Sequence, residues 1–154
     1  MNDNLKKSLE ELGVDFIKEL TNQLLAADKK ATGQLINSLD YKVVEVLDNL
    51  LLTILSEPYL KYIDEGRKPG RMPPSQVFIR WIDAKGIVFK NKKGKIIKKE
   101  STAFLIARSI GKNGIKPTNI IRKTIDNVYS NKTALLEKAA AKDVEALLEK
   151  ILVI

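Results

Sequence analysis

The stretch LDYKVVEVLDNLLLTILS, residues 39–56, decides the fold class. Its first half is rich in valine and tyrosine and its second half is almost wholly apolar, which predicts strands at Leu39–Val46 and Leu50–Ser56. Asp48-Asn49 between them tolerates positive φ and favours a tight hairpin turn. Because the second strand is apolar on both faces, we expect it to be covered by the chain's own long helix on one side and by a neighbouring subunit on the other.

Helical patterns surround this hairpin. Leucine and phenylalanine recur every three or four residues over about Asn4–Lys30, which predicts a long amphipathic helix with Gly13 as a candidate kink. A single turn through Gln34–Asn37, capped by Thr32, should follow. Later helices are expected at Ser75–Lys85 with Gly86 as its stop, at Ser101–Ile110 with Ser101 as its cap, from Pro117 onward, and at Thr133–Ile151 after a break at Ser130–Lys132.

This order of elements predicts an α+β fold. An antiparallel sheet (main hairpin about 39–56, minor hairpin about 87–97) should be packed by the long N-terminal helix and several C-terminal helices. At 154 residues we expect one domain over 1–154, with a C-terminal helical extension at about 132–154. Within the helix at 75–85, Val77, Phe78, Trp81 and Ile82 are expected to face inward; a partner-binding anchor is the alternative for Trp81.

The chain has no cysteine and no histidine. This excludes disulfides, thiolate nucleophiles, Ser-His-Asp triads and zinc sites built from nitrogen or sulfur. Only carboxylate metal sites remain, and we predict no catalytic, cofactor-binding or metal-binding residues. The apolar runs, such as Leu50–Leu55, are far too short to cross a bilayer, and the charged start MNDNLKKSLEELG lacks the features of a signal peptide. We therefore expect a protein made in a cytosol, without a membrane partner.

The stretch YLKYIDEGRKPGRMPP, residues 59–74, is the strongest candidate for a functional segment. An aromatic-rich part leads into an acidic pair and then into a glycine- and proline-rich basic loop. No reaction needs residues in this order, whereas a docking surface does. The candidate interface residues are Tyr59, Tyr62, Asp64, Glu65, Arg67, Lys68 and Arg71.

Asp64-Glu65 also permits a second interpretation, a carboxylate-metal phosphodiesterase site. Such a site needs converging carboxylates, and only Glu57 and Asp83 lie nearby in sequence. Salt bridges with Arg67 or Arg71, within the chain or across an interface, are the favoured interpretation. GKNG at 111–114 is a weak phosphate-binding motif, because the ending of a helix explains both of its glycines.

The formal net charge of +8 suggests a polyanionic neighbour: nucleic acid, an acidic protein face or an anionic membrane. The excess is spread along the chain except for one run. The candidate residues for contact with DNA or an acidic surface are Lys90, Lys92, Lys93, Lys95, Lys98 and Lys99. Phe89 is the only aromatic residue among them, so base stacking is not indicated, and a solvated loop is the alternative.

The order of these segments resembles a known family, the small tail-component and tail-completion proteins of long-tailed bacteriophages, which sit near the head–tail junction. After the long helix, Thr32, Gly33, Leu35 and Ser38 match a first element of that pattern. Tyr59, Tyr62, Glu65 and Gly66 match a second, which Met72-Pro73-Pro74 closes. The later PSQVFIRWIDAKGI and AFLIARSIGKNGIKPTNII are similar to a branch of these proteins. The lysine run and the long C-terminal helix lie outside the simplest pattern.

The resemblance implies a structural virion protein without enzymatic activity, forming an oligomeric ring or collar that joins the head to the tail. Its partners would be copies of itself and portal, adaptor or tail-tube proteins, with DNA passing through the channel. The expected location is the neck or tail of the virion. The alternative function is a small basic nucleic-acid-binding protein that contacts phosphates non-specifically.

Overall fold

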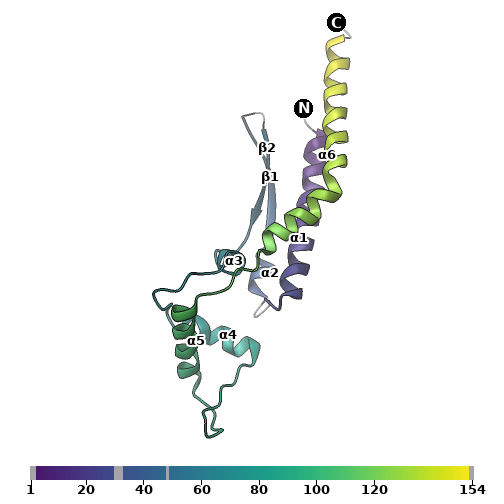
Figure 1. The fold of residues 1–154 in the computed structure, drawn as a ribbon. Coiled ribbons are helices and arrows are strands. Elements are labelled where there is room, and N and C mark those ends of the chain that lie inside the picture. Colours follow the sequence, from purple (N-terminus) through teal and green to yellow (C-terminus); the bar gives the residue numbers. More distant parts are fainter. Residues whose placement is uncertain (1–2, 30–32, 48, 153–154) are drawn as a thin grey trace. The chain divides into compact units, whose positions relative to one another are not determined.

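The computed structural model describes residues 3–29, 33–47 and 49–152 (Figure 1). It confirms the α+β class, with an N-terminal helix, one two-stranded antiparallel hairpin and several C-terminal helices. The chain forms two compact units. Unit 1 comprises Met1–Asp28, Ser38–Glu57 and Ile120–Ile154, and unit 2 comprises Lys29–Asn37 and Pro58–Asn119.

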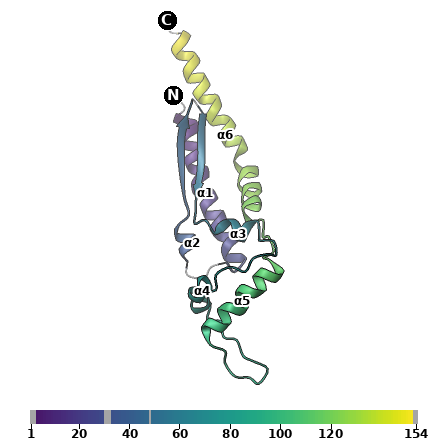
Figure 2. The same ribbon diagram turned by 90° about the vertical axis from the view of Figure 1, so that its left-hand side faces the viewer.

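Unit 1 is built around its first helix. It contains α1 (Asp3–Ala26), β1 (Asp40–Val46), β2 (Asn49–Leu55) and α6 (Ile120–Leu152). Helix α1 packs against both the hairpin and α6 (Figure 2). Side chains from α1 and α6 form the core of the unit: Leu20, Leu24, Ile120, Val128 and Ala139. Burying each of the larger ones stabilises the fold by about 1.5–3 kcal/mol.

Gly13 does not divide α1, which runs unbroken from Asp3 to Ala26 and so stops short of the predicted Lys30. The glycine is buried beneath the ring of Tyr41 on β1. A Cβ at this position would lie 2.7 Å from Tyr41 Cγ, well inside van der Waals contact. The missing side chain therefore allows the hairpin to approach the helix. Asp15, two residues further along α1, pairs with Lys132 of α6.

The hairpin turn lies one residue earlier than predicted. Asn49, expected in the turn, instead pairs with Val46 in the ladder, and Leu47 takes the positive φ of 48°. Asp48 lies outside the described residues. This register places Tyr41, Val43, Leu50, Leu52 and Ile54 on one face. A turn at Asp48-Asn49 would shift each pair by two residues and keep these side chains on the same face, so the pattern of faces does not decide between the two turns.

Helix α6 is continuous where a break was expected at Ser130–Lys132. Figure 1 shows a bend within the helix instead. Three neighbouring side chains donate hydrogen bonds to carbonyls one turn earlier: Ser130 to Asp126 at 2.7 Å, Asn131 to Asn127 at 2.8 Å, and Thr133 to Tyr129 at 2.8 Å. Such bonds compete for helix carbonyls and commonly bend a helix without ending it.

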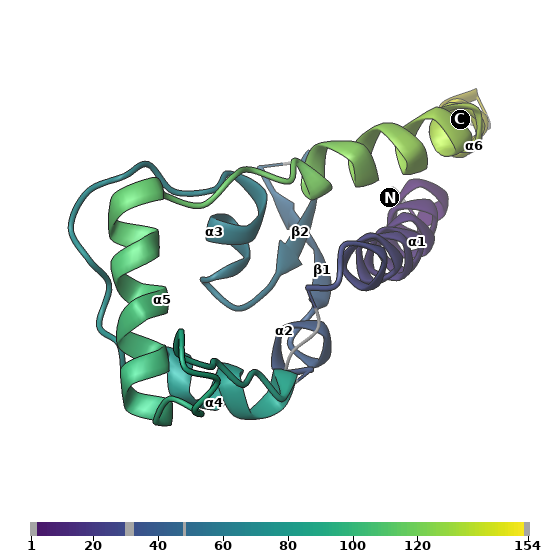
Figure 3. The ribbon, with the colours of Figure 1, turned by 60° about the horizontal axis from the view of Figure 1, so that its bottom comes forward.

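Unit 2 contains four short helices: α2 (Gln34–Asn37), α3 (Leu60–Asp64), α4 (Val77–Lys85) and α5 (Lys99–Asn113). Helix α4 packs on α5 (Figure 3). The buried apolar side chains are Leu35, Leu60, Ile82, Ala103 and Ala107. The expected turn at 34–37 is confirmed, although its predicted cap Thr32 lies outside the described residues.

The ends of the unit 2 helices follow the sequence only in part. Gly86 ends α4 in the left-handed conformation, as predicted. Helix α5 begins at Lys99 and so before Ser101, the predicted cap; Lys98 occupies the cap position, without a side-chain hydrogen bond. The minor hairpin at about 87–97 consists of a single bridge pair, Lys90 with Ile96, rather than two strands.

Candidate functional site

The segment 59–74 begins with α3, which places two aromatic side chains in solvent. Leu60 is buried and anchors the helix in unit 2. Tyr59 and Tyr62 are 40% and 53% exposed. Because tyrosine combines a large apolar ring with a hydroxyl, an exposed pair of this kind suits a contact surface.

After α3 the backbone runs against the segment that follows α5. Arg67 and Ile115 exchange backbone hydrogen bonds, 2.9 Å from Arg67 N to Ile115 O and 2.8 Å in the reverse direction. Gly66 has a φ of 73°, and a Cβ there would collide with the Ile115 carbonyl. The amides of Thr118 and Asn119 both donate to the Asp64 carbonyl, at 2.9 and 3.1 Å. These backbone hydrogen bonds hold the start of the loop, from Asp64 to Arg67, against the segment that follows α5.

The glycines of GKNG take part in the same packing. Gly114 has a φ of 72°, and a Cβ there would collide with the Arg67 carbonyl oxygen. A Cβ on Gly111 would lie 3.1 Å from Met72 Cα, and the Gly111 carbonyl accepts a hydrogen bond from Gly70 N at 2.8 Å. Close backbone approach explains these glycines, in addition to the helix ending inferred from the sequence.

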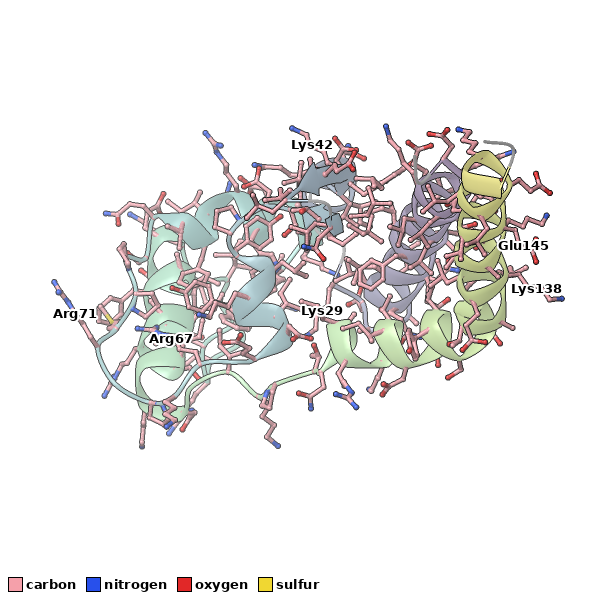
Figure 4. The ribbon with its side chains drawn as sticks, turned by 90° about the horizontal axis from the view of Figure 1, so that it is seen from above. Lys29, Lys42, Arg67, Arg71, Lys138 and Glu145 are labelled. Atoms are coloured by element: carbon pink, nitrogen blue, oxygen red, sulfur yellow. The ribbon has the colours of Figure 1, made fainter. Side chains whose placement is uncertain are left out.

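The charged residues of this segment have separate roles. Glu65 pairs with Lys61 on α3 at 3.8 Å, and both side chains are largely exposed. The Arg67 guanidinium donates to the Arg71 carbonyl and so closes the loop internally. Lys68 and Arg71 are exposed, and Arg71 points away from the chain (Figure 4). Tyr59, Tyr62, Lys68 and Arg71 are thus exposed at the surface, whereas Arg67 supports the loop.

The run of lysines lies on a tight loop, residues 87–98, which we call the lysine finger. Asn91 organises its tip: its Oδ1 accepts hydrogen bonds from the amides of Lys93 and Lys95, both at 2.9 Å. Ile97 N donates to Phe89 O at 2.8 Å. The finger therefore presents five lysines in solvent: Lys90, Lys92, Lys93, Lys95 and Lys98. Lys99 does not belong with them, because it begins α5 and forms an ion pair with Asp83 of α4.

Helix α4 departs from the prediction for Trp81 and Val77. Ile82 is buried and Phe78 is half-buried, as expected, but Val77 is 61% exposed and Trp81 38% exposed. Val77, Arg80, Trp81 and Ala84 form the outer face of α4. The reason is that α4 packs chiefly on α5 among the described elements, so its opposite face stays in solvent.

Charge is divided unequally between the two units. Over the ranges of unit 2 the sequence has 17 lysine and arginine residues against 4 aspartate and glutamate residues, a net +13. Over unit 1 it has 10 against 15, a net −5, and the two values account for the overall +8. The basic excess that seemed spread along the sequence is therefore a property of unit 2. Counting charges over 58–119 would have revealed it.

A polar groove of about 590 Å³ lies between α1 and α6 in unit 1. Lys132 Nζ lies 2.7 Å from Asp15 Oδ2, and this hydrogen bond raises the pKa of Lys132. Glu19 accepts hydrogen bonds from Gln23 at 2.8 Å and from Asn127 at 2.9 Å, and these two bonds lower its pKa. The charged groups of the groove thus hold α1 and α6 together.

Asp143 of α6 caps the first turn of α1. Its carboxylate accepts hydrogen bonds from the amides of Leu5 at 2.9 Å and Asn4 at 3.2 Å. The bond from Leu5 is the main reason that the pKa of Asp143 is lowered. An N-terminal helix turn has amides without helical partners and favours negative charge. No sequence pattern indicated this contact, because it joins residues far apart in the chain.

Within the described residues, no group of three or more acidic side chains is arranged to hold a metal ion. No helix among them has an apolar stretch long enough to span a bilayer. Comparisons with protein-family models, with curated proteins and with solved structures find no match. The candidate site consists of exposed surfaces: the segment 59–74, the lysine finger and the outer face of α4.

Proposed function

We propose that this chain is a structural subunit of a bacteriophage neck or tail-completion assembly, which works by binding copies of itself and neighbouring virion proteins rather than by catalysis. The order of sequence elements described above motivates the class. Portal, adaptor or tail-tube proteins are the expected neighbours. The neck or tail of the virion is the expected location.

The observation that carries the assembly role is the hairpin. One face packs on α1, and the other exposes Val44, Val46 and Leu51, each between 39% and 49%. The sheet has only two strands in the described part of the chain, so each strand also has an unpaired edge. Two-stranded sheets are marginal alone, and exposed apolar faces and open edges are typical contact sites.

The test is to find the chain in particles and then to change this face. We expect the chain at the vertex that carries the tail, in electron micrographs of particles labelled with an antibody against it. The variant Val44→Lys/Leu51→Lys should remain folded but fail to enter particles. Thr53→Lys lies on the same face at a position that is already polar and serves as the matched control. Absence of the unaltered chain from mature particles would refute the proposed function.

A second candidate function is supported by the +13 charge of unit 2 and the five exposed lysines of the finger. These features suit non-specific contact with phosphates. If the isolated chain binds double-stranded DNA tightly at physiological salt and is absent from particles, nucleic-acid binding becomes the better assignment.

A further inference from the structure

The C-terminal end of α6 projects beyond the helix on which it packs. Asp143 contacts the first turn of α1, which begins at Asp3, and α6 continues to Leu152. Figures 1 and 2 both show this last part of α6 running past the start of α1. Val144 and Leu148, one helical turn apart, are 55% and 51% exposed. Unit 1 thus presents an apolar pair on a helix end that it does not cover.

An acidic pair runs beside this apolar pair. Glu145 and Glu149 are also one turn apart, and both are exposed (Figure 4 labels Glu145). Lys150 is the only basic residue between 144 and 150. The projecting end therefore combines an apolar stripe with negative charge, the pattern of a helix that docks on an apolar, basic surface.

The outer face of α4 has the complementary pattern. Val77 and Trp81 are one turn apart and exposed, and Arg80 lies next to Trp81 on the same face. Tryptophan and arginine are the residues that most often dominate binding energy at interfaces. The surrounding unit carries a net +13, which attracts an acidic helix at long range.

We propose that the projecting end of α6 from one copy docks on the outer face of α4 of another copy. Val144 and Leu148 pack against Val77 and Trp81, and Glu145 and Glu149 face Arg80. The two surfaces differ, so the contact is heterologous; repeated from copy to copy, it closes a ring or extends a filament. This inference rests on the proposed assembly function and names the contact between copies that the function requires.

The contact is expected to be weak for a single pair of copies. Two apolar pairs and three charges bury much less than the roughly 1,200–2,000 Å² of a stable interface. In a closed ring each copy uses both surfaces, and the second contact benefits from the effective concentration set by the first. Covalent trapping is therefore a better measurement than dimer affinity.

The chain has no cysteine, so single introduced thiols report on one contact each. Val77→Cys and Val144→Cys, one of them carrying a size tag, are mixed and oxidised mildly. We expect a mixed disulfide dimer to form at least about tenfold faster than in a mixture of Val77→Cys with Val14→Cys. Val14 is the matched control, because it is an exposed valine on α1. Circular dichroism of each variant confirms that it is folded.

Exchanging the charges tests the proposed attraction between Arg80 and the pair Glu145 and Glu149. Arg80→Glu in the Val77→Cys chain should slow formation of the mixed dimer several-fold. Glu145→Arg/Glu149→Arg in the Val144→Cys chain should restore the rate for that partner. If Val77→Cys formed disulfides with any exposed thiol regardless of its surroundings, neither charge change would alter the rate of dimer formation.

Two results would overturn the inference. One is trapping no faster than with the Val14→Cys control. The other is a monomeric internal disulfide in a Val77→Cys/Val144→Cys chain without mixed dimers, which would place the contact within one molecule. If the chain is nevertheless found in particles, the assembly function stands and only this contact is wrong. If the mixed dimer forms efficiently but the chain is absent from particles, the contact between copies stands and the proposed virion function is wrong.

Discussion

Gly13 illustrates how a single residue position sets the distance between two elements. Alanine normally stabilises a helix by about 1 kcal/mol relative to glycine. Here its methyl would displace the Tyr41 ring, and overpacking costs about 1–3 kcal/mol. We expect Gly13→Ala to lower the free energy of unfolding in urea. In a Tyr41→Ala background the same substitution should be neutral or stabilising, and destabilisation in both backgrounds would contradict the packing argument.

Gly114 and Gly94 differ in both backbone strain and backbone contact. Both have a φ near 70°, but Gly94 has open space where a Cβ would lie, whereas Gly114 combines this φ with a ψ of −163°, which only glycine adopts readily, and lies against the Arg67 carbonyl. Gly94→Ala should therefore cost only the strain of a left-handed alanine, about 1 kcal/mol, and Gly114→Ala clearly more. Trp81 is the only tryptophan and lies in unit 2, so its fluorescence during urea unfolding measures both variants. Equal costs would show that the contact with Arg67 is unimportant.

At the residue scale, the sequence predicts the structural role of some glycines and not of others. Gly86 was predicted because a helix stop has a local signature, and the structure confirms it. The contacts of Gly13 with Tyr41 and of Gly66 with Ile115 join residues far apart in the chain, so local patterns carry no signal for them. Trp81 was misjudged for a related reason: helical spacing shows which residues share a face but not how much room the neighbouring helix leaves.

At the scale of elements, the sequence predicted the hairpin, α1, α4 and α5. Hydrophobic periodicity is a local pattern, so it can be recognised without knowing the folded contacts. The sequence placed the turn one residue late, because both turns keep the same side chains on the face toward α1 and the strand pattern cannot distinguish them. It expected a break in α6 where polar side chains gather, and the structure has a bend. The interface role of the segment 59–74 stays a prediction, and the internal hydrogen bond from Arg67 to the Arg71 carbonyl depends on the folded path of the loop.

The contact between α6 and the start of α1 should depend on pH through Asp143. Hydrogen bonds hold its pKa below the usual carboxylate value. The stabilisation is therefore present above the unfolded-state pKa and is lost as the pH falls through the lowered folded-state pKa. We expect Asp143→Ala to reduce the urea midpoint at neutral pH, with the difference from the unaltered chain disappearing in strong acid.

Glu145→Ala is the control for Asp143→Ala, because it removes an exposed carboxylate from the next residue of the same helix. It should leave the midpoint nearly unchanged at both pH values. A loss in Asp143→Ala that persists in strong acid would mean that packing, not the charged cap, is responsible.

At the scale of the whole molecule, the segregation of charge matters more than its sum. A +8 protein with evenly distributed charge would bind polyanions weakly and from any side, whereas here the cationic potential belongs to unit 2. The net −5 of unit 1 opposes contact with phosphates. In an assembly this division would direct unit 2 toward nucleic acid or acidic proteins, and it also favours contact between unlike units of successive copies.

Binding to double-stranded DNA at low salt should therefore depend on where lysines are removed. Changing Lys90, Lys92, Lys93 and Lys95 to glutamine takes the net charge from +8 to +4, as does changing Lys6, Lys7, Lys138 and Lys142 of unit 1. All eight are exposed. We expect the finger variant to lose affinity and to reduce the slope of log K against log salt by up to about 3.6, at roughly 0.9 per phosphate contact. The unit 1 variant should keep the slope. Similar losses in both would show that DNA responds to the total charge, and that the finger has no special position in binding.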